Sequence, residues 1–128
     1  MIQYQFILPE ENAVKGFNDI LQLIEKSKHK PYLSVLKKYK ENTSPGLLSF
    51  PLNGFSMALD FPMKNGLTSF LNKLDQVVIQ YNGRIYLAKD ACLQAQSFSV
   101  MYPNLNKFKT IVASSNYSSI LANRLYIK

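Results

Sequence analysis

The stretch Gly83-Arg84-Ile85-Tyr86-Leu87-Ala88-Lys89-Asp90 decides the fold of this chain. It follows a helical pattern, opens with a glycine break and predicts a short strand over 84–88. It then stops on a charged pair, where a core strand would continue with apolar residues. A lysine at the end of a buried strand is unfavourable without a partner or a ligand. Lys89 therefore belongs either to a solvated ion pair in a surface loop or to a binding site.

Three more strands precede this stretch. Residues 2–8 alternate apolar side chains with Gln3 and Gln5, and residues 55–61 alternate in the same way. A period of two is typical of a strand with two chemically different faces. Residues 32–39 predict a third, less regular strand.

Two segments have the spacing of amphipathic helices. The first follows Glu10-Glu11-Asn12 and the second follows Asn65-Gly66. Apolar residues recur three and four positions apart in both, which predicts one buried stripe per helix. The first stripe is Val14, Phe17, Leu21 and Ile24; the second is Leu67, Phe70, Leu71, Leu74, Val77 and Val78.

The order strand, helix, strand, strand, helix, strand predicts an α+β, ferredoxin-like βαββαβ fold, with both helices on one face of an antiparallel sheet. The covered face should hold Ile2, Tyr4, Phe6, Met57, Leu59, Ile85 and Leu87. The other face should carry Gln3, Gln5, Ser56, Ala58, Asp60, Tyr86 and Ala88. An antiparallel sheet can leave one face to water, so this face is either solvated or part of a site for a polar ligand.

The ferredoxin-like unit is expected over residues 1–92, with a turn-rich loop at 41–46. Residues 93–128 predict a helical C-terminal extension. An extension beyond a complete unit suggests docking on another domain.

Composition favours a folded domain, with 47% hydrophobic residues and a mean hydropathy of −0.10. No apolar run approaches the roughly 18 residues of a membrane span, and no secretory signal is visible. A single cysteine, Cys92, excludes an internal disulfide and a cysteine-based zinc site.

The net charge of +7 permits anionic partners. The densest basic group includes Lys26, Lys28, His29 and Lys30 and is either a solvated face or a basic patch. We expect His29, the only histidine, to be an exposed turn residue.

The motifs of common active sites are missing. The sequence has no glycine-rich phosphate loop, no GxSxG, no HExxH and no CxxC. A ferredoxin-like module for RNA or another anionic partner is an alternative, although Tyr86 supplies only one of the aromatic residues that RNA recognition uses. A plain interaction domain whose open sheet face pairs with itself is another alternative.

A set of short matches runs in order along nearly the whole chain. They are 3–6, 33–37, 48–51, 54–62, 83–90 and 101–103. With them the chain resembles the C-terminal, substrate-side part of FAD-linked oxidoreductases of the vanillyl-alcohol oxidase type.

The resemblance implies roles for individual residues. Lys89 would lie beside the flavin ring, where a cation stabilises negative charge on the reduced cofactor, and Tyr86 would contact the FAD. Gln3, Gln5 and Lys37 would line the substrate pocket, and Ser56 and Ala58 would face the flavin. The member that the chain most resembles has asparagine and cysteine at these last two places, which leaves the substrate open. No metal is implied.

The resemblance also implies partners. The family carries an N-terminal FAD-binding domain that nothing in this chain provides, so we expect a fragment of a longer protein or a separately encoded half, inactive alone. FAD would be bound mainly by that absent domain. The substrate would be a sugar-type alcohol or a polyprenyl-phosphate sugar. The location would be cytoplasmic, with the inner membrane surface as a second possibility.

Overall fold

A computed structural model of the chain describes residues 1–40, 46–115 and 118–127. Four strands form one antiparallel sheet in the order β2-β3-β1-β4. The strands are β1 (Ile2–Pro9), β2 (Leu33–Tyr39), β3 (Gly54–Phe61) and β4 (Arg84–Ile85). This is the order of the predicted ferredoxin-like fold, and the predicted fold class is confirmed.

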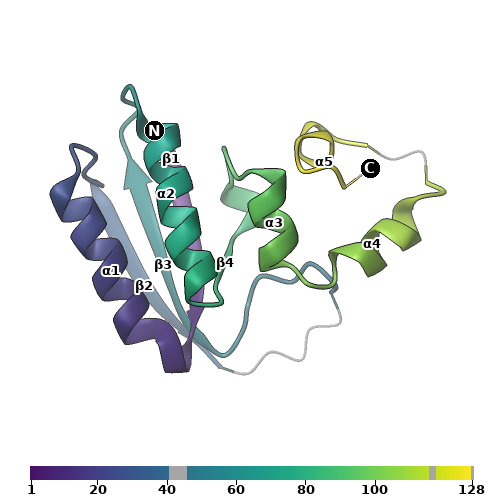
Figure 1. The fold of residues 1–128 in the computed structure, drawn as a ribbon, viewed down its shortest axis with the longest axis horizontal. Coiled ribbons are helices and arrows are strands. Elements are labelled where there is room, and N and C mark those ends of the chain that lie inside the picture. Colours follow the sequence, from purple (N-terminus) through teal and green to yellow (C-terminus); the bar gives the residue numbers. More distant parts are fainter. Residues whose placement is uncertain (41–45, 116–117, 128) are drawn as a thin grey trace.

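Two helices, α1 (Ala13–Lys26) and α2 (Leu67–Gln80), cover one face of the sheet (Figure 1). Short 3-10 helices precede α1 and follow β4, namely η1 (Glu10–Asn12) and η2 (Leu87–Lys89). The C-terminal part holds α3 (Ala95–Met101), α4 (Leu105–Val112) and α5 (Ile120–Arg124). None of the helices in the described ranges has the length and apolar character needed to cross a bilayer.

The strand register sets the two faces of the sheet. Phe6 lies opposite Met57 on the face that the helices bury, and Gln5 lies opposite Ala58 on the other face. Because successive side chains of a strand point to opposite faces, each pairing fixes the rest of its strand. The buried cluster under the helices includes Tyr4, Phe6, Leu8, Met57, Leu59, Phe61 and Ile85, together with residues of α1 and α2. The predicted division of β1 and β3 between two faces is therefore correct.

The buried stripe of α1 differs from the predicted one. Val14 is 75% exposed and Leu21 is 46% exposed. The helix instead buries Ala13, Gly16, Ile20 and Ile24. Ala13 and Gly16 are small, so the helix lies close to the sheet at this point and buries both residues. Small side chains add little to a hydrophobic pattern, and the sequence pattern therefore does not reveal their burial.

The stretch from Gly83 to Asp90 forms less strand than predicted. Only Arg84–Ile85 pairs with β1, and the chain then turns into η2. The prediction of a strand over 84–88 is wrong in its second half. Leu87 is only partly buried and Ala88 is exposed, so neither continues the two faces of the sheet.

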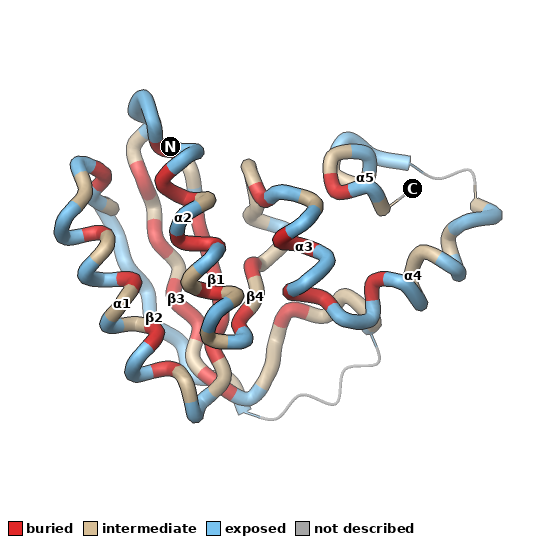
Figure 2. The backbone as a smooth tube through the Cα atoms, in the orientation of Figure 1, coloured by how far each residue is buried: buried red, intermediate tan, exposed pale blue. Residues whose placement is uncertain are grey.

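The beginning of the C-terminal extension joins the main core. Leu93, Phe98 and Met101 are buried in the same cluster as the sheet. The Tyr102 hydroxyl donates a 2.5 Å hydrogen bond to the carbonyl of Ile85, which ties the end of α3 to β4. By contrast, Leu105 is the one buried residue of α4, α5 has no buried residue, and the remaining residues of both helices are partly or fully exposed (Figure 2).

Candidate functional site

A hollow of about 500 Å³ lies on the side of the sheet that α1 and α2 leave uncovered. It is lined by Gln5, Lys37, Tyr39, Ser49, Phe50, Pro51, Tyr86 and Lys89. These residues come from β1, β2, the connection before β3, and the segment after β4. Side chains far apart in the sequence therefore meet at one place.

Gln5 forms the floor of the hollow. Its side chain is 5% exposed, and its Nε2 donates a 3.0 Å hydrogen bond to Oγ of Ser56 on β3. Its backbone carbonyl accepts a 2.8 Å hydrogen bond from the amide of Tyr86. A primary amide has two donor hydrogens and an acceptor oxygen, so this fixed group retains hydrogen-bonding capacity for a ligand.

Two lysines border the hollow, one from a strand and one from a 3-10 helix. Lys37 is exposed on β2, and Lys89 is partly buried on η2. The amide of Lys89 donates a 3.1 Å hydrogen bond to the carbonyl of Tyr86, so the turn of η2 sets where the lysine leaves the backbone. Among the residues that the structure describes, no carboxylate lines the hollow, and these residues therefore favour an anionic or electron-rich ligand.

Three aromatic rings make one wall. Phe50 packs against Tyr86 with ring centroids 4.8 Å apart and meets Tyr39 edge-on at 6.3 Å. Such contacts fix ring orientation more tightly than area burial alone. These rings and Lys89 line the same hollow.

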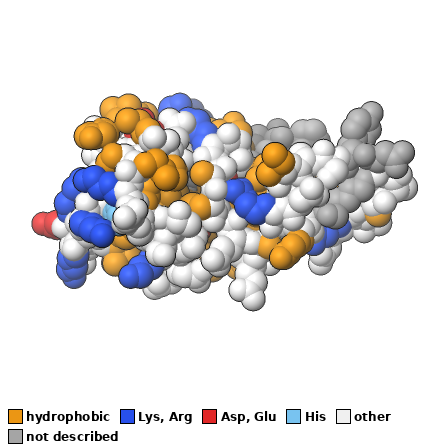
Figure 3. Space-filling view, turned by 90° about the horizontal axis from the view of Figure 1, so that it is seen from above, with side chains coloured by type: hydrophobic (Ala, Val, Ile, Leu, Met, Phe, Trp, Pro, Cys, Tyr) orange, Lys and Arg blue, Asp and Glu red, His pale blue; other side chains and the backbone are white. Residues whose placement is uncertain are grey.

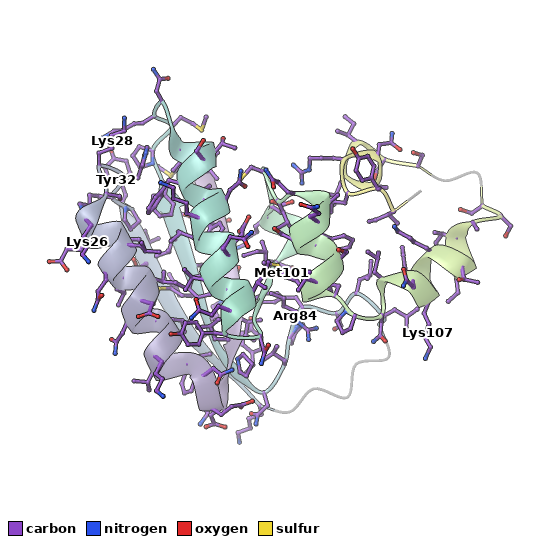
Figure 4. The ribbon with its side chains drawn as sticks, in the orientation of Figure 1. Lys26, Lys28, Tyr32, Arg84, Met101 and Lys107 are labelled. Atoms are coloured by element: carbon purple, nitrogen blue, oxygen red, sulfur yellow. The ribbon has the colours of Figure 1, made fainter. Side chains whose placement is uncertain are left out.

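Arg84 holds the connection before β3 in place. Its guanidinium donates a 2.7 Å hydrogen bond to the carbonyl of Ser49 and lies over the ring of Tyr102 at 5.4 Å (Figure 4). Burial lowers the pKa of Arg84. Because this residue fastens a lining segment, the mouth of the hollow depends on β4 and α3 as well as on the sheet.

The structure brings four of the seven predicted site residues to the hollow: Gln5, Lys37, Tyr86 and Lys89. Ser56 lies beneath them as the partner of Gln5, and Ala58 lies opposite Gln5 on β3. Gln3 shares the face but is exposed and does not line the hollow.

Sequence reasoning missed the lining role of Tyr39 and the segment 49–51. The signal was an apolar connector: Phe50 is 5% exposed, and a phenylalanine in a connection must find a surface to cover. The prediction for His29 was wrong. It is 5% exposed and stacks on Phe70 with centroids 5.3 Å apart, because the turn after α1 folds back over the start of α2.

The described residues contain no group of three or more His, Cys, Asp and Glu side chains that could hold a metal ion. Cys92 is half-buried, and burial raises the pKa of its thiol to about 11, so it is a poor nucleophile at neutral pH.

No family model matches the chain. Comparison with curated proteins finds 38% identity over 98% of this chain to a decaprenylphosphoryl-beta-D-ribose oxidase of Mycolicibacterium smegmatis. The resemblance to this oxidase is confirmed. An uncharacterised protein encoded in the mprA 5′ region of Streptomyces coelicolor is 40% identical over 64% of the chain.

The chain spans about a quarter of the length of these relatives, 28% of the first and 24% of the second.

Proposed function

We propose that this chain is the substrate-side part of an FAD-linked oxidoreductase that oxidises a sugar-type alcohol. The observation that carries the proposal is the meeting of Gln5, Lys37, Tyr86 and Lys89 in one hollow. Similarity to an oxidase over nearly the whole chain supports it.

The chemistry of the hollow fits one side of a flavin. Lys89 lies next to aromatic side chains, and none of the described lining residues is a carboxylate that would oppose negative charge. Tyr86 and Lys89 are the residues that would contact the cofactor, which would be held mainly by a domain outside this chain. FAD, when bound, supplies the acceptor for the hydride that leaves the alcohol carbon.

Lys89 would act by charge. Lys89 is partly buried as a residue, and its ammonium group would stabilise negative charge on a flavin ring bound beside it. The hydrogen bond from its amide to Tyr86 fixes the backbone from which it projects, so little rearrangement is needed at the moment of reaction.

Gln5 and Lys37 would bind and orient the substrate. The amide of Gln5 is held by Ser56 and can hydrogen-bond sugar hydroxyl groups, whereas Lys37 can pair with a phosphate of a polyprenyl-phosphate sugar. Ala58 leaves room beside Gln5, because its side chain is small and lies opposite Gln5 in the register. Gln3 would contact only a ligand that reaches beyond the hollow.

The extension at 93–128 is proposed as part of the contact with the FAD-binding domain. It exposes Val100, Ile111, Ile120 and Tyr126, each more than half accessible. The inner membrane surface stays part of this proposal as a location, because a polyprenyl-phosphate sugar resides in a bilayer.

The test uses the protein that contains this chain together with an FAD-binding domain. Flavin reduction by sugar alcohols is followed anaerobically by absorbance. Lys89→Ala should slow flavin reduction by about 10²-fold, the usual effect of removing one electrostatic stabiliser. Gln5→Leu should weaken substrate binding and leave the flavin spectrum unchanged.

The matched control is Lys15→Ala, which removes an exposed lysine on α1 outside both the hollow and the C-terminal extension. Normal flavin reduction by Lys89→Ala would refute the role of that residue. Absence of any flavin in the assembled protein would refute the proposed function as a whole.

A further inference from the structure

Four lysines gather at the end of the sheet where β1 begins. Lys26 is the last residue of α1, Lys28 and Lys30 lie between α1 and β2, and Lys64 lies between β3 and α2. All four are exposed. The two connections are neighbours because the amide of Tyr32 donates a 2.8 Å hydrogen bond to the carbonyl of Asp60. We call this set of four lysines, with the apolar residues described next, the basic end.

Large apolar side chains stand among these lysines. Tyr32 is 75% exposed, Met63 is 62% exposed and Leu33 is 55% exposed. Figure 3 looks down on this end and shows the blue lysine side chains around the pale blue histidine, with orange apolar side chains beside them. Exposed apolar groups with a polar rim are typical of an interaction site.

The positive charges of Lys28 and Lys64 act on His29, which lies at the start of α2. His29 is buried there, its Nδ1 has no hydrogen-bond partner among the described residues, and its Nε2 lies 3.7 Å from the position that a Cβ would take at Gly66. Lys28 and Lys64 both lower the pKa of His29, as burial does, so both ammonium groups act on this place. Gly66 caps α2 without a side-chain hydrogen bond, and a helix N-terminus adds positive potential.

Two carboxylates lie near this end. Glu25 is exposed near the end of α1, and Asp60 is partly exposed near the end of β3, on the uncovered face of the sheet. Four lysines outnumber them. The ammonium group of Lys30 also donates to the carbonyls of Ile24 and Glu25, at 2.7 and 2.5 Å, so Lys26, Lys28 and Lys64 are the cations most available to a partner.

We propose that the basic end docks on the surface of a bilayer that contains anionic phospholipids. Tyr32, Leu33 and Met63 enter the interface between headgroups and acyl chains, and the lysines face the lipid phosphates. Complementary charge and a small apolar insertion together are the usual basis of peripheral membrane binding.

The side chains favour a membrane over single-stranded RNA. RNA binding without sequence preference uses rows of aromatic rings on which bases stack, and the apolar residues here are one tyrosine, one leucine and one methionine. Aliphatic side chains suit acyl chains and offer no stacking platform. The proposal stands apart from the hollow, whose β2 residues Lys37 and Tyr39 lie toward the opposite end of that strand.

The test is sedimentation of the chain with vesicles of phosphatidylcholine, with and without phosphatidylglycerol. We expect binding only when phosphatidylglycerol is present, and release by high salt. Because each lysine near an anionic surface is worth about fivefold in partitioning, Lys28→Ala with Lys64→Ala should weaken binding by roughly 30-fold. Tyr32→Ser with Met63→Ser should weaken it by roughly tenfold or more at unchanged salt dependence.

Lys107→Ala is the control, because this exposed lysine lies on α4, away from the basic end (Figure 4). All substituted side chains are exposed, so circular dichroism should show unchanged folding. Equal binding to both vesicle types, or none to either, would overturn the proposal. Salt-sensitive binding of single-stranded RNA that the lysine variants abolish, without vesicle binding, would assign the surface to RNA instead.

Discussion

The Tyr4 hydroxyl donates a 2.8 Å hydrogen bond to Oδ1 of Asp75 inside the core. The pair joins β1 to α2, and both residues are at least 95% buried. Tyr4→Phe keeps the ring and leaves a buried carboxyl without its donor, so we expect a loss of roughly 1–3 kcal/mol in the free energy of unfolding. Urea denaturation measures it. An unchanged free energy of unfolding would mean that a water molecule donates to Asp75 in place of the Tyr4 hydroxyl.

Asp75 should give the stability of the chain a distinctive pH dependence. Burial raises its pKa to about 6, against the ordinary value of 3.8. Between these values the folded state keeps a proton that the unfolded state has released, so the free energy of unfolding falls as pH rises. Two pKa units correspond to about 3 kcal/mol. Asp75→Asn should remove this slope in urea titrations between pH 4 and 6; a variant that keeps the slope would place its origin elsewhere.

His29 should titrate below its ordinary pKa of 6.5. Burial disfavours the imidazolium, and Lys28 and Lys64 repel it. The folded state therefore binds fewer protons than the unfolded state just below pH 6.5, and stability from this group falls as pH drops through that window. The chain has one histidine, so proton NMR reports it directly. A pKa at or above 6.5 would contradict the buried position.

The sequence predicted the fold most accurately in the strands where apolar and polar side chains alternate strictly. β1 and β3 alternate, so their faces, and with them Gln5 and Ser56, could be assigned before any coordinates. α1 was harder, because Ala13 and Gly16 carry almost no hydrophobic signal although both are buried. Their burial depends on the distance between the helix and the sheet, and a local sequence pattern does not predict that distance.

The sequence predicted the site residues that lie on strands, such as Gln5 and Lys37. It did not predict that the connection before β3 also lines the hollow. Phe50 reaches the hollow because the segment before β3 folds back against Tyr86. Such long-range contacts depend on tertiary packing. His29 was misassigned for the same reason, since a polar residue in a turn is usually exposed and only the contact with Phe70 buries it.

Gly54 should tolerate no side chain. A Cβ there would lie 2.0 Å from the carbonyl oxygen of Leu8, a backbone atom in the paired strand. Gly54→Ala must therefore push β1 and β3 apart, and we expect a loss above about 3 kcal/mol in the free energy of unfolding. Gly16→Ala is the comparison and should cost less, because its Cβ would meet only side-chain atoms, the end of Leu8 at 2.4 Å and the ring of Tyr81 at 3.1 Å. Equal effects of the two substitutions in urea denaturation would contradict this distinction.

Arg124 should hold the segment after η2 in place. Its guanidinium pairs with the Asp90 carboxylate and donates a 2.6 Å hydrogen bond to the carbonyl of Ala91. The Asp90 side chain is 4% exposed and also accepts from the amides of Cys92 and Leu93, at 2.9 and 2.7 Å. Without Arg124 this carboxylate loses its charged partner, and the turn it organises should open more often.

Arg124→Gln should therefore speed hydrogen exchange at the amides of Cys92 and Leu93 and reduce stability by roughly 2 kcal/mol. Arg124→Lys keeps the charge and should restore part of the protection. Tyr126→Ala, at a neighbouring position that is 73% exposed, should change neither. Since Asp90 directly follows Lys89, loss of this protection would show that α5 steadies the backbone beside the hollow. Unchanged exchange in Arg124→Gln would show that the Asp90 turn holds without the ion pair.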